Sequence, residues 1–290
     1  MRCKPLLRLY FRLKTWWPVW YYALNSRARK KLHADPPVLD NLQRRIVREL
    51  RKSGIATTTL EELFPGEHWL ERLTAYVDQH RHEVVAQTKK PYLKNFWEVH
   101  PPLDFDNPYL QLSVNQCILD IVNSYMQMYT KLNYYFLAQT IPVGNARETK
   151  SQRWHRDPEE PRMCKMFIYL SDVDETAGPF IYIPYTVRGQ KWSHLFPQKS
   201  PSGNYPPEES VNKIPQHETR LTITGAAGTV IFCDTTGLHR GGYATVKERV
   251  MFTAFYTSPC WSEPPRYKRS DTSRRYLNDL SPQARYALEH

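Results

Sequence analysis

The sequence predicts an α+β fold, with helices in the first part of the chain and an antiparallel β sandwich or barrel in the second. Up to about residue 130, apolar side chains recur at helical spacing. From about residue 131, short runs rich in β-branched and aromatic residues follow one another, separated by Gly, Pro, Asp and Asn. Consecutive short strands without helices between them favour an antiparallel sandwich or barrel over a parallel sheet with crossover helices.

The first strong helical pattern covers residues 38–53. Four apolar side chains fall on one side of this helix: Leu39, Leu42, Ile46 and Leu50. Gly54 follows directly and predicts the end of the helix. A short apolar alternation, residues 55–60, comes next.

Two further helical stretches complete the front of the chain. Residues 60–85 have a helical pattern that Pro65-Gly66 interrupts. Residues 86–107 have no regular pattern. Asn107-Pro108 then predicts the start of a helix over 109–130, because a capping residue followed by proline is typical of a helix N-terminus.

Five strand-like runs follow, at residues 132–143, 163–173, 178–186, 220–234 and 249–257. The stretch 187–220 is polar and contains prolines, and its length predicts a lid or insert. We expect one catalytic domain overall. Its parts are a basic aromatic N-terminal arm (1–36), a helical support region packed on the core (37–130), the strand core with its lid (131–258) and a C-terminal tail (259–290).

The excess positive charge of the chain is confined to its first part. Residues 1–52 hold 14 Lys and Arg against 3 Asp and Glu, and the remaining residues balance at 26 against 26. Nucleic acid is therefore not expected as a partner of the body of the protein. The arm mixes cations with Trp, Tyr and Leu. This mixture suits peripheral contact with an anionic membrane or with nucleic acid, or packing of the aromatic residues on the main domain.

Cysteine usage predicts a cytoplasmic protein. The five cysteines are odd in number and widely scattered, and none forms a CxxC pair: Cys3, Cys117, Cys164, Cys233 and Cys260. Such thiols are typical of a reducing compartment. No run reaches the roughly 18–20 apolar residues that span a bilayer, so any membrane contact is expected to be peripheral.

One His-x-Asp pair has the setting of a metal site. His155 and Asp157 precede the strand-like run 163–173, and side chains two apart in an extended chain point to the same face. His33 and Asp35 have the same spacing, but they lie in the basic arm before two prolines, without a strand pattern or a partner histidine. About one such match is expected by chance in a chain with ten histidines, so we interpret the arm's pair as that match.

A third metal ligand and a carboxylate-binding arginine occur near the end of the strand part. A predicted strand leads through a Gly-containing turn to His239, and Arg249 opens another strand ten residues later. Two histidines and one carboxylate with open positions suit a non-haem Fe(II) oxygenase. The planar fork of an arginine suits the distal carboxylate of a 2-oxoacid.

Four parts of the sequence resemble the phytanoyl-CoA dioxygenase family of Fe(II)/2-oxoglutarate oxygenases: WHRD (154–157), FIYLSDVDETAGPFIYIPYT (167–186), GTVIFCDTTGLHRGG (228–242) and Arg249. The resemblance extends over about residues 131–258. It implies a double-stranded β-helix (jelly-roll, cupin-like) core flanked by N-terminal helices. The chain departs from the family where PYTV (184–187) replaces its Pro-Gly-Ser-His, a change expected at the rim of the pocket rather than at the metal.

The resemblance also implies the roles of individual residues. His155, Asp157 and His239 would hold Fe(II), and Arg249 would pair with the distal carboxylate of 2-oxoglutarate. O2 would be the second cosubstrate, with ascorbate supporting activity. The reaction would hydroxylate a C–H bond and release succinate and CO2. Because Asp157 keeps the carboxylate that halogenating members lack, halogenation is not expected, whereas desaturation and epimerisation stay open.

Residues around this site are assigned more loosely. In the strand-like run 163–173, Lys165, Phe167 and Tyr169 fall on one face and alternate with Cys164, Met166 and Ile168. Phe167 would flank the cosubstrate, with Lys165 and Tyr169 as weaker contacts, and ordinary packing inside the barrel is the alternative for all three. Three aromatic residues are candidates for the pocket lining: Phe136, Trp154 and Tyr182. The remaining polar residues are expected to be solvated: Arg156, Glu159 and Glu160 at the mouth, His194 and His217 in the lid, and His80 and His82 at a helix end.

Two other classes of function remain as alternatives. A non-catalytic cupin-type binding protein would normally have lost a ligand or the arginine, and all of them are present here. A zinc-dependent hydrolase could use the same His-Asp-His set, but it would leave Arg249 without a carboxylate to bind. The substrate expected is a small molecule or an acyl or lipid-like compound.

Overall fold

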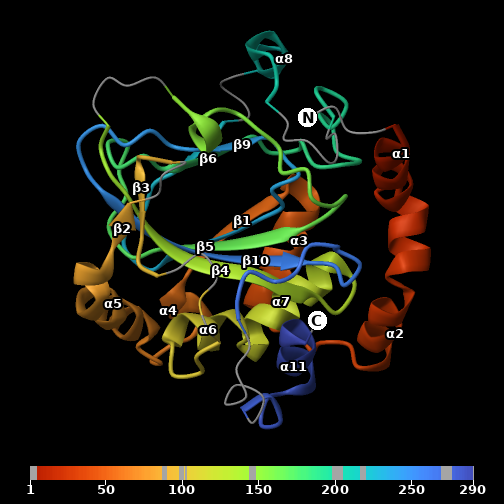
Figure 1. Cartoon of the computed structure of the whole chain (residues 1–290), viewed down its shortest axis with the longest axis horizontal. Coiled ribbons are helices and arrows are strands. Elements are labelled where there is room, and N and C mark those ends of the chain that lie inside the picture. Colours follow the sequence, from red (N-terminus) through yellow and green to blue (C-terminus); the bar gives the residue numbers. More distant parts are fainter. Residues whose placement is uncertain are drawn as a thin grey trace.

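Two antiparallel sheets and a layer of helices make up the computed structural model, which describes residues 5–86, 90–97, 101, 103–143, 148–197, 205–215, 220–268 and 276–289. The larger sheet has the strand order β1-β8-β5-β10-β4-β3-β2 and the smaller one β7-β6-β9. Helices α3, α4, α6, α7 and α11 lie on the outer face of the larger sheet, and the smaller sheet lies on its other side (Figure 1). This is the predicted α+β, jelly-roll arrangement.

The strands of the larger sheet are β1 (Ile55–Thr59), β2 (Val85–Ala86), β3 (Leu93–Asn95), β4 (Lys131–Thr140), β5 (Cys164–Tyr169), β8 (Thr229–Cys233) and β10 (Arg249–Thr257). Those of the smaller sheet are β6 (Phe180–Tyr182), β7 (Leu221–Ile223) and β9 (His239–Gly241). Strands β1, β2 and β3 come from the region expected to be helical, and they extend the larger sheet at its two edges.

The helices in the front part are α1 (Pro5–Lys14), the π-helical η1 (Val19–Leu24), α2 (Ser26–Ala34), α3 (Asn41–Ser53), α4 (Leu60–Leu63), α5 (Trp69–His80), η2 (Arg81–Glu83), α6 (Pro108–Ser113) and α7 (Gln116–Met126). Later come η3 (Lys150–Gln152), α8 (Glu208–Asn212) and α11 (Pro282–Leu288). Among the residues described, no helix combines the length and apolar character that crossing a membrane requires.

The helix boundaries follow local capping chemistry. Asp40 forms a capping box with Gln43 at the start of α3, and Gly54 ends that helix in the left-handed region at φ 84°. The single helix expected over 109–130 is two helices, because the chain turns at Val114 and the side chain of Asn115 caps α7 by accepting from the Cys117 backbone N–H.

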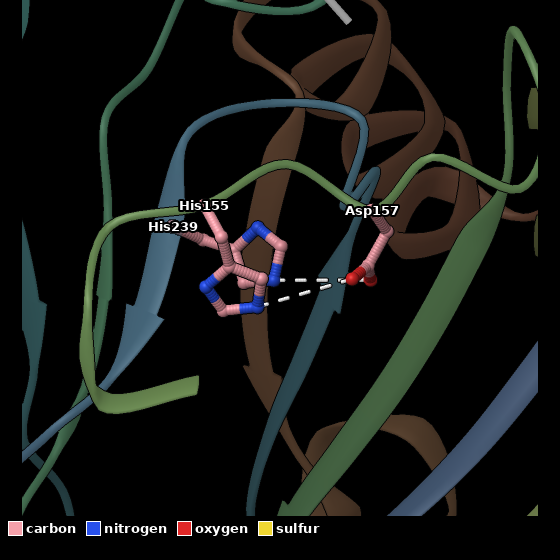
Figure 2. A group of neighbouring side chains, drawn as sticks. All are labelled: His155, Asp157 and His239. Carbon is pink, nitrogen blue, oxygen red and sulfur yellow. Dashed lines mark ion pairs between the residues drawn. The ribbon is translucent and has the colours of Figure 1, made fainter. Parts of the chain in front are cut away.

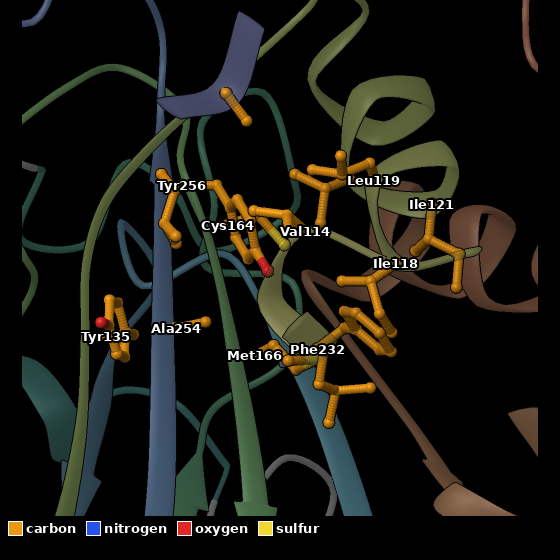
Figure 3. Close-up of a cluster of buried hydrophobic side chains, with 14 of the residues drawn as sticks. Val114, Ile118, Leu119, Ile121, Tyr135, Cys164, Met166, Phe232, Ala254 and Tyr256 are labelled. Carbon is orange, nitrogen blue, oxygen red and sulfur yellow. The ribbon is translucent and has the colours of Figure 1, made fainter. Parts of the chain in front are cut away.

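Strand β5 divides the interior into two clusters. Cys164, Met166 and Ile168 face the helical layer, where they join a large buried cluster with side chains of α7, β8 and β10 (Figure 3). Phe167 and Tyr169 point the other way, into a second cluster between the two sheets. This is the period of two expected for a pleated strand with both faces covered, and it confirms the predicted alternation. The second cluster lines the inside of the barrel, where a site can form.

The N-terminal arm is helical and partly built into the core. Trp20 is 1% exposed, and its Nε1 donates to Oε1 of Glu160 at 3.1 Å. Trp17 stacks on Tyr21 with ring centroids 5.2 Å apart, and the Arg162 guanidinium lies over Trp17. The alternative in which aromatic residues of the arm pack on the main domain is therefore correct for these side chains.

Removing the anchoring indole should destabilise the protein. Trp20→Ala leaves a large cavity and removes one of the hydrogen bonds to Glu160, so we expect the free energy of unfolding to fall by about 3–5 kcal/mol in urea denaturation. Trp16→Ala is the matched control, because Trp16 lies four residues earlier and is 56% exposed. It should change the free energy by less than about 0.5 kcal/mol. Equal losses in the two variants would contradict this account of the arm.

Glu160 should make stability depend on pH. Burial raises the pKa of its carboxyl from 4.5 to about 7, although Ser258 and Trp20 donate to it. The folded protein therefore holds this proton more tightly than the unfolded chain. The resulting stabilisation is complete below about pH 4.5 and is lost as the pH rises through about 7. We expect wild type to lose about 3 kcal/mol relative to Glu160→Gln across that window, measured by denaturation at each pH. A pH-independent difference would contradict this.

Candidate metal centre

Backbone pairing brings the two predicted histidines together. The N–H of His155 donates to the carbonyl of His239 at 3.0 Å, and the N–H of His239 donates back at 3.0 Å. Two residues on, the N–H of Asp157 donates to the carbonyl of Thr235 at 2.9 Å. The segment 155–157 is thus held as an extended strand beside the turn that carries His239. Its two alternate side chains point to one side, as expected for a strand.

The side chains converge on a common point (Figure 2). The two imidazole rings lie 4.2 Å apart, and each Nε2 is 3.8 Å from an oxygen of Asp157. One ligand atom from each residue falls within 4.8 Å of the others. Nδ1 of His155 contacts the Arg153 carbonyl and Nδ1 of His239 the Gly237 carbonyl. A proton on each Nδ1 leaves each Nε2 with a free lone pair for a metal.

The electrostatics keep these groups in metal-binding form. Burial lowers the pKa of His155, and burial together with His155 lowers the pKa of His239 to about 3, so both imidazoles stay neutral. Burial alone would raise the pKa of Asp157, but Lys165 and the two histidines outweigh it and bring that pKa well below its usual range. The carboxyl group is therefore ionised.

Lys165 contacts Asp157 directly. Its Nζ lies 2.6 Å from Oδ2 of Asp157, and both side chains are largely buried. Burial opposes the charge on the lysine, but Asp157 raises the pKa of Lys165 above its ordinary value. Lys165, named above as a weak candidate for touching the cosubstrate, thus lies against a ligand residue. Its ion pair fixes Oδ2 of the carboxylate, the oxygen that is also 3.8 Å from Nε2 of His239, while Oδ1 lies 3.8 Å from Nε2 of His155.

Arg249 is buried inside the same barrel. It stands opposite Thr140 in the register of β10 and β4. Its Nη1 donates to the Gly178 carbonyl, and its Nη2 donates to Oγ1 of Thr140 at 3.2 Å. Its Nε is buried without a hydrogen-bond partner among the residues described. A buried guanidinium with a vacant donor is suited to binding an anion.

Phe167 and Tyr169 form part of the wall of the barrel. The ring of Phe167 lies 4.9 Å from that of Phe180. The hydroxyl of Tyr169 donates to the Ile223 carbonyl at 2.8 Å and accepts from the Phe180 N–H at 3.0 Å. Tyr169 also lies beside Arg249, and its presence raises the pKa of that guanidinium against the effect of burial.

The structure overturns the expectation that Arg156 is solvated. Arg156 is 2% exposed, because alternate residues of an extended chain point to opposite sides and both its neighbours face the metal site. Its guanidinium donates to four carbonyls: those of Thr186, Leu195, Phe196 and Thr236. Arg156 therefore ties the segment 186–196 to the turn before His239.

Glu160 and Glu159 are also not the solvated residues expected. Glu160 is 1% exposed, because the arm covers it and Ser258 donates to it from its backbone N–H at 2.6 Å. Glu159 is partly buried, and its Oε2 is a buried atom without a hydrogen-bond partner in the described part of the chain. Burial, together with Asp157, raises the pKa of Glu159 to about 7.

Lys90 is a site residue that the sequence did not indicate. Burial and the charge of Lys165 lower the pKa of Lys90, while the charge of Asp157 raises it, so Lys90 interacts electrostatically with both groups. It comes from the stretch before β3 that has no regular pattern in the sequence. Only the register of β3 on β4 brings that stretch to the barrel, and no local motif could have revealed it.

Described residues of the stretch predicted as a lid pack on the barrel through a small apolar cluster. Trp192 and Leu195 pack against Ile183 and Leu238. The ring of Tyr205 reaches to 6.0 Å from that of His155. His194 is exposed, as expected, and His217 lies outside the described residues.

The three candidate lining residues have different positions. Phe136 is partly buried and faces the inside of the barrel opposite Thr253 of β10. Trp154 is half-buried and packs on the lid cluster. Tyr182 is fully buried in the wall, where its hydroxyl donates to the Asp234 carbonyl at 2.9 Å. A side chain at Gly54 or Gly237 would collide with that hydroxyl, so both positions need glycine.

The other histidines that the structure describes belong to no further cluster of potential ligands. His155, Asp157 and His239 form the single group of three potential metal ligands found in the described ranges. His33 and Asp35 are both exposed, as expected for a chance match. His82 is exposed, whereas His80 is half-buried and stacks on Tyr76 with ring centroids 3.9 Å apart.

A model of the phytanoyl-CoA dioxygenase (PhyH) family matches residues 62–249, well over half of the chain. The chain belongs to the phytanoyl-CoA dioxygenase family. It is an enzyme that depends on Fe(II) and 2-oxoglutarate, with O2 as the usual oxidant of the family, and it acts on a small-molecule substrate. A search of the curated proteins gives no match.

Three solved structures illustrate the likeness of fold. The epimerase SnoN, in complex with Fe3+, alpha ketoglutarate and nogalamycin RO, is 16% identical over 78% of this chain and 87% of that chain, with a TM-score of 0.53. The carbocyclase SnoK from nogalamycin biosynthesis is 17% identical over 84% of this chain and 92% of that chain, with a TM-score of 0.54. EctD from S. alaskensis with bound Fe is 17% identical over 80% of this chain and 82% of that chain, with a TM-score of 0.53. At these identities the likeness shows the fold, and it confirms the predicted jelly roll.

The residues present in the barrel fit both members of the family's cofactor pair. Two neutral imidazole nitrogens and an ionised carboxylate, converging from one side, suit a non-haem iron with open positions. The vacant Nε of Arg249 suits one oxygen of a dicarboxylate.

Metal binding should require the predicted pair and not its counterpart in the arm. His155→Ala and Asp157→Ala should each weaken binding of Fe(II) by about 100-fold or more, because each removes one of three protein ligands. The measurement is anaerobic calorimetric titration of the metal-free protein. His33→Ala and Asp35→Ala are the matched controls and should bind as wild type does. Loss of binding in the controls, or its retention in the first pair, would refute this assignment.

Proposed function

We propose that this enzyme hydroxylates a C–H bond of a small molecule or an acyl or lipid-like compound, with His155, Asp157 and His239 holding the iron and Arg249 binding the distal carboxylate of 2-oxoglutarate. The observation that carries the proposal is the convergence of the three ligand atoms within 4.8 Å inside a barrel that also buries an arginine with a vacant Nε. Both features are needed for an iron oxygenase driven by a 2-oxoacid.

The residues of the chain prepare the site before substrate arrives. Carbonyls of Arg153 and Gly237 hold the proton of each histidine on Nδ1, so that each Nε2 faces the metal. The ion pair with Lys165 orients the Asp157 carboxylate. The bound iron supplies the chemistry that couples conversion of 2-oxoglutarate and O2 into succinate and CO2 to substrate oxidation.

Arg249 would orient the cosubstrate. With two of its nitrogens fixed on Gly178 and Thr140, its planar group cannot rotate, so the remaining Nε–H points in one direction. Phe167 and Phe180, whose rings pack at 4.9 Å with an angle of 44° between their planes, would shield the cosubstrate from water. Lys90 adds a second cation near the ligands, which favours anionic groups there.

The charge and the thiols of the chain support a proposal for its location and its partners. Cys117, Cys164, Cys233 and Cys260 are free, in keeping with a cytoplasmic location. The excess of cations in residues 1–52 supports peripheral contact with a membrane. Because the rest of the chain has no net charge, nucleic acid is not the proposed substrate. SnoN, SnoK and EctD share only their fold with this chain, so they support a metabolite as the substrate through that likeness alone.

Turnover without substrate tests the proposal. Wild type with Fe(II), ascorbate and 2-oxoglutarate should release succinate. Arg249→Lys keeps the positive charge but removes the planar guanidinium that can donate two hydrogen bonds to a carboxylate, so the KM for 2-oxoglutarate should rise about tenfold. Arg249→Ala also removes the charge and should raise this KM about 100-fold. The control is Arg45→Ala, which removes a surface ion pair with Glu49 and Glu62. The proposal fails if wild type forms no succinate or if zinc supports a hydrolysis that iron does not.

A further inference from the structure

Exposed apolar side chains gather in the arm. Half of the large apolar side chains that are exposed in the described part of the chain fall within residues 9–24: Leu9, Tyr10, Leu13, Trp16, Tyr22 and Leu24. Leu9 and Leu13 are four residues apart in α1, so they lie on one side of the helix, and Trp16 lies two residues after its end. We call Leu9, Tyr10, Leu13 and Trp16 the arm surface. The other exposed apolar residues, such as Val246, lie singly along the chain.

The arm surface is held rigidly by its opposite side. Lys14 is buried with its Nζ over the ring of Trp261, and Trp20 is inserted into the core against Glu160. Figure 1 shows α1 and α2 lying along one side of the barrel. The exposed side chains are therefore presented at a fixed place on the molecule, so that docking would not require the arm to fold first.

The charge around this surface identifies its occupant. The first 34 residues contain nine Lys and Arg and no Asp or Glu. Arg12, between Leu9 and Leu13, is exposed. A second copy of the chain would bring an equally basic arm to this surface and would be repelled. Leu, Tyr and Trp beside cations on a helix are typical of segments that lie in the interface of an anionic bilayer.

We propose that the arm surface docks on a bilayer containing anionic phospholipid. Leu9, Leu13 and Trp16 enter the boundary between headgroups and acyl chains, and Arg12 pairs with lipid phosphate. The arm is anchored on Glu160, three residues after Asp157.

The test is flotation of the full-length protein with vesicles. Wild type should bind vesicles of phosphatidylcholine with phosphatidylglycerol about tenfold or more tightly than vesicles of phosphatidylcholine alone, and high ionic strength should reduce the difference. The double variant Leu13→Glu/Trp16→Glu should lose about tenfold or more of the binding to anionic vesicles. Val246→Glu is the matched control, because it adds a charge at an apolar side chain that is 71% exposed elsewhere, and it should bind as wild type does.

Each outcome decides the proposal. The proposal is overturned if wild type does not bind anionic vesicles more tightly than neutral ones. It is also overturned if the double variant binds anionic vesicles as wild type does. A wild-type dimer that the double variant dissociates would show that a second copy covers the arm surface, and this too overturns it. Succinate release by the double variant should equal that of wild type, which shows that the variant is folded. Vesicle binding requires no iron, so its failure and a failure of the oxygenase reaction are seen separately.

Discussion

The site depends on a short antiparallel pairing between residues 155–157 and the turn 235–239. Three backbone hydrogen bonds, two between His155 and His239 and one from Asp157 to Thr235, join segments about eighty residues apart. Because the pairing is extended, it sets both histidines and the aspartate on one side and Arg156 on the other. The ligand geometry is thus a property of the main chain, which side-chain packing then supports.

The turn is supported in its own right from the helical layer. Asp234 accepts from the hydroxyl of Tyr125 on α7 at 2.6 Å, and its backbone N–H donates to the Gly54 carbonyl at the end of α3. The hydroxyl of Tyr182 bonds the Asp234 carbonyl from the smaller sheet. Helices, larger sheet and smaller sheet therefore meet at one residue just before His239. The helical front of the chain is part of the support of the metal centre.

The sequence alone predicted those features of the fold and of the site that leave a pattern within a short segment. Period-two alternation predicted the two faces of β5, and the spacing of His155, Asp157, His239 and Arg249 picked out the residues that the fold brings into one barrel. The polar surroundings were predicted wrongly for a physical reason. Glu160 is buried by Trp20, 140 residues away, and Lys90 reaches the ligands only through the register of β3 on β4. Contacts of this range leave no pattern in a local segment.

Arg156 links the segment 186–196 to the segment that carries His155 and Asp157. Arg156 lies between His155 and Asp157 in the chain, and its guanidinium donates hydrogen bonds to the carbonyls of Thr186, Leu195 and Phe196 in the segment 186–196. Lifting that segment would pull on the peptide that joins His155 to Asp157. The enclosure and the coordination geometry therefore cannot relax independently. Arg156 thus joins the segment 186–196 and the segment that carries His155 and Asp157 into one hydrogen-bonded unit.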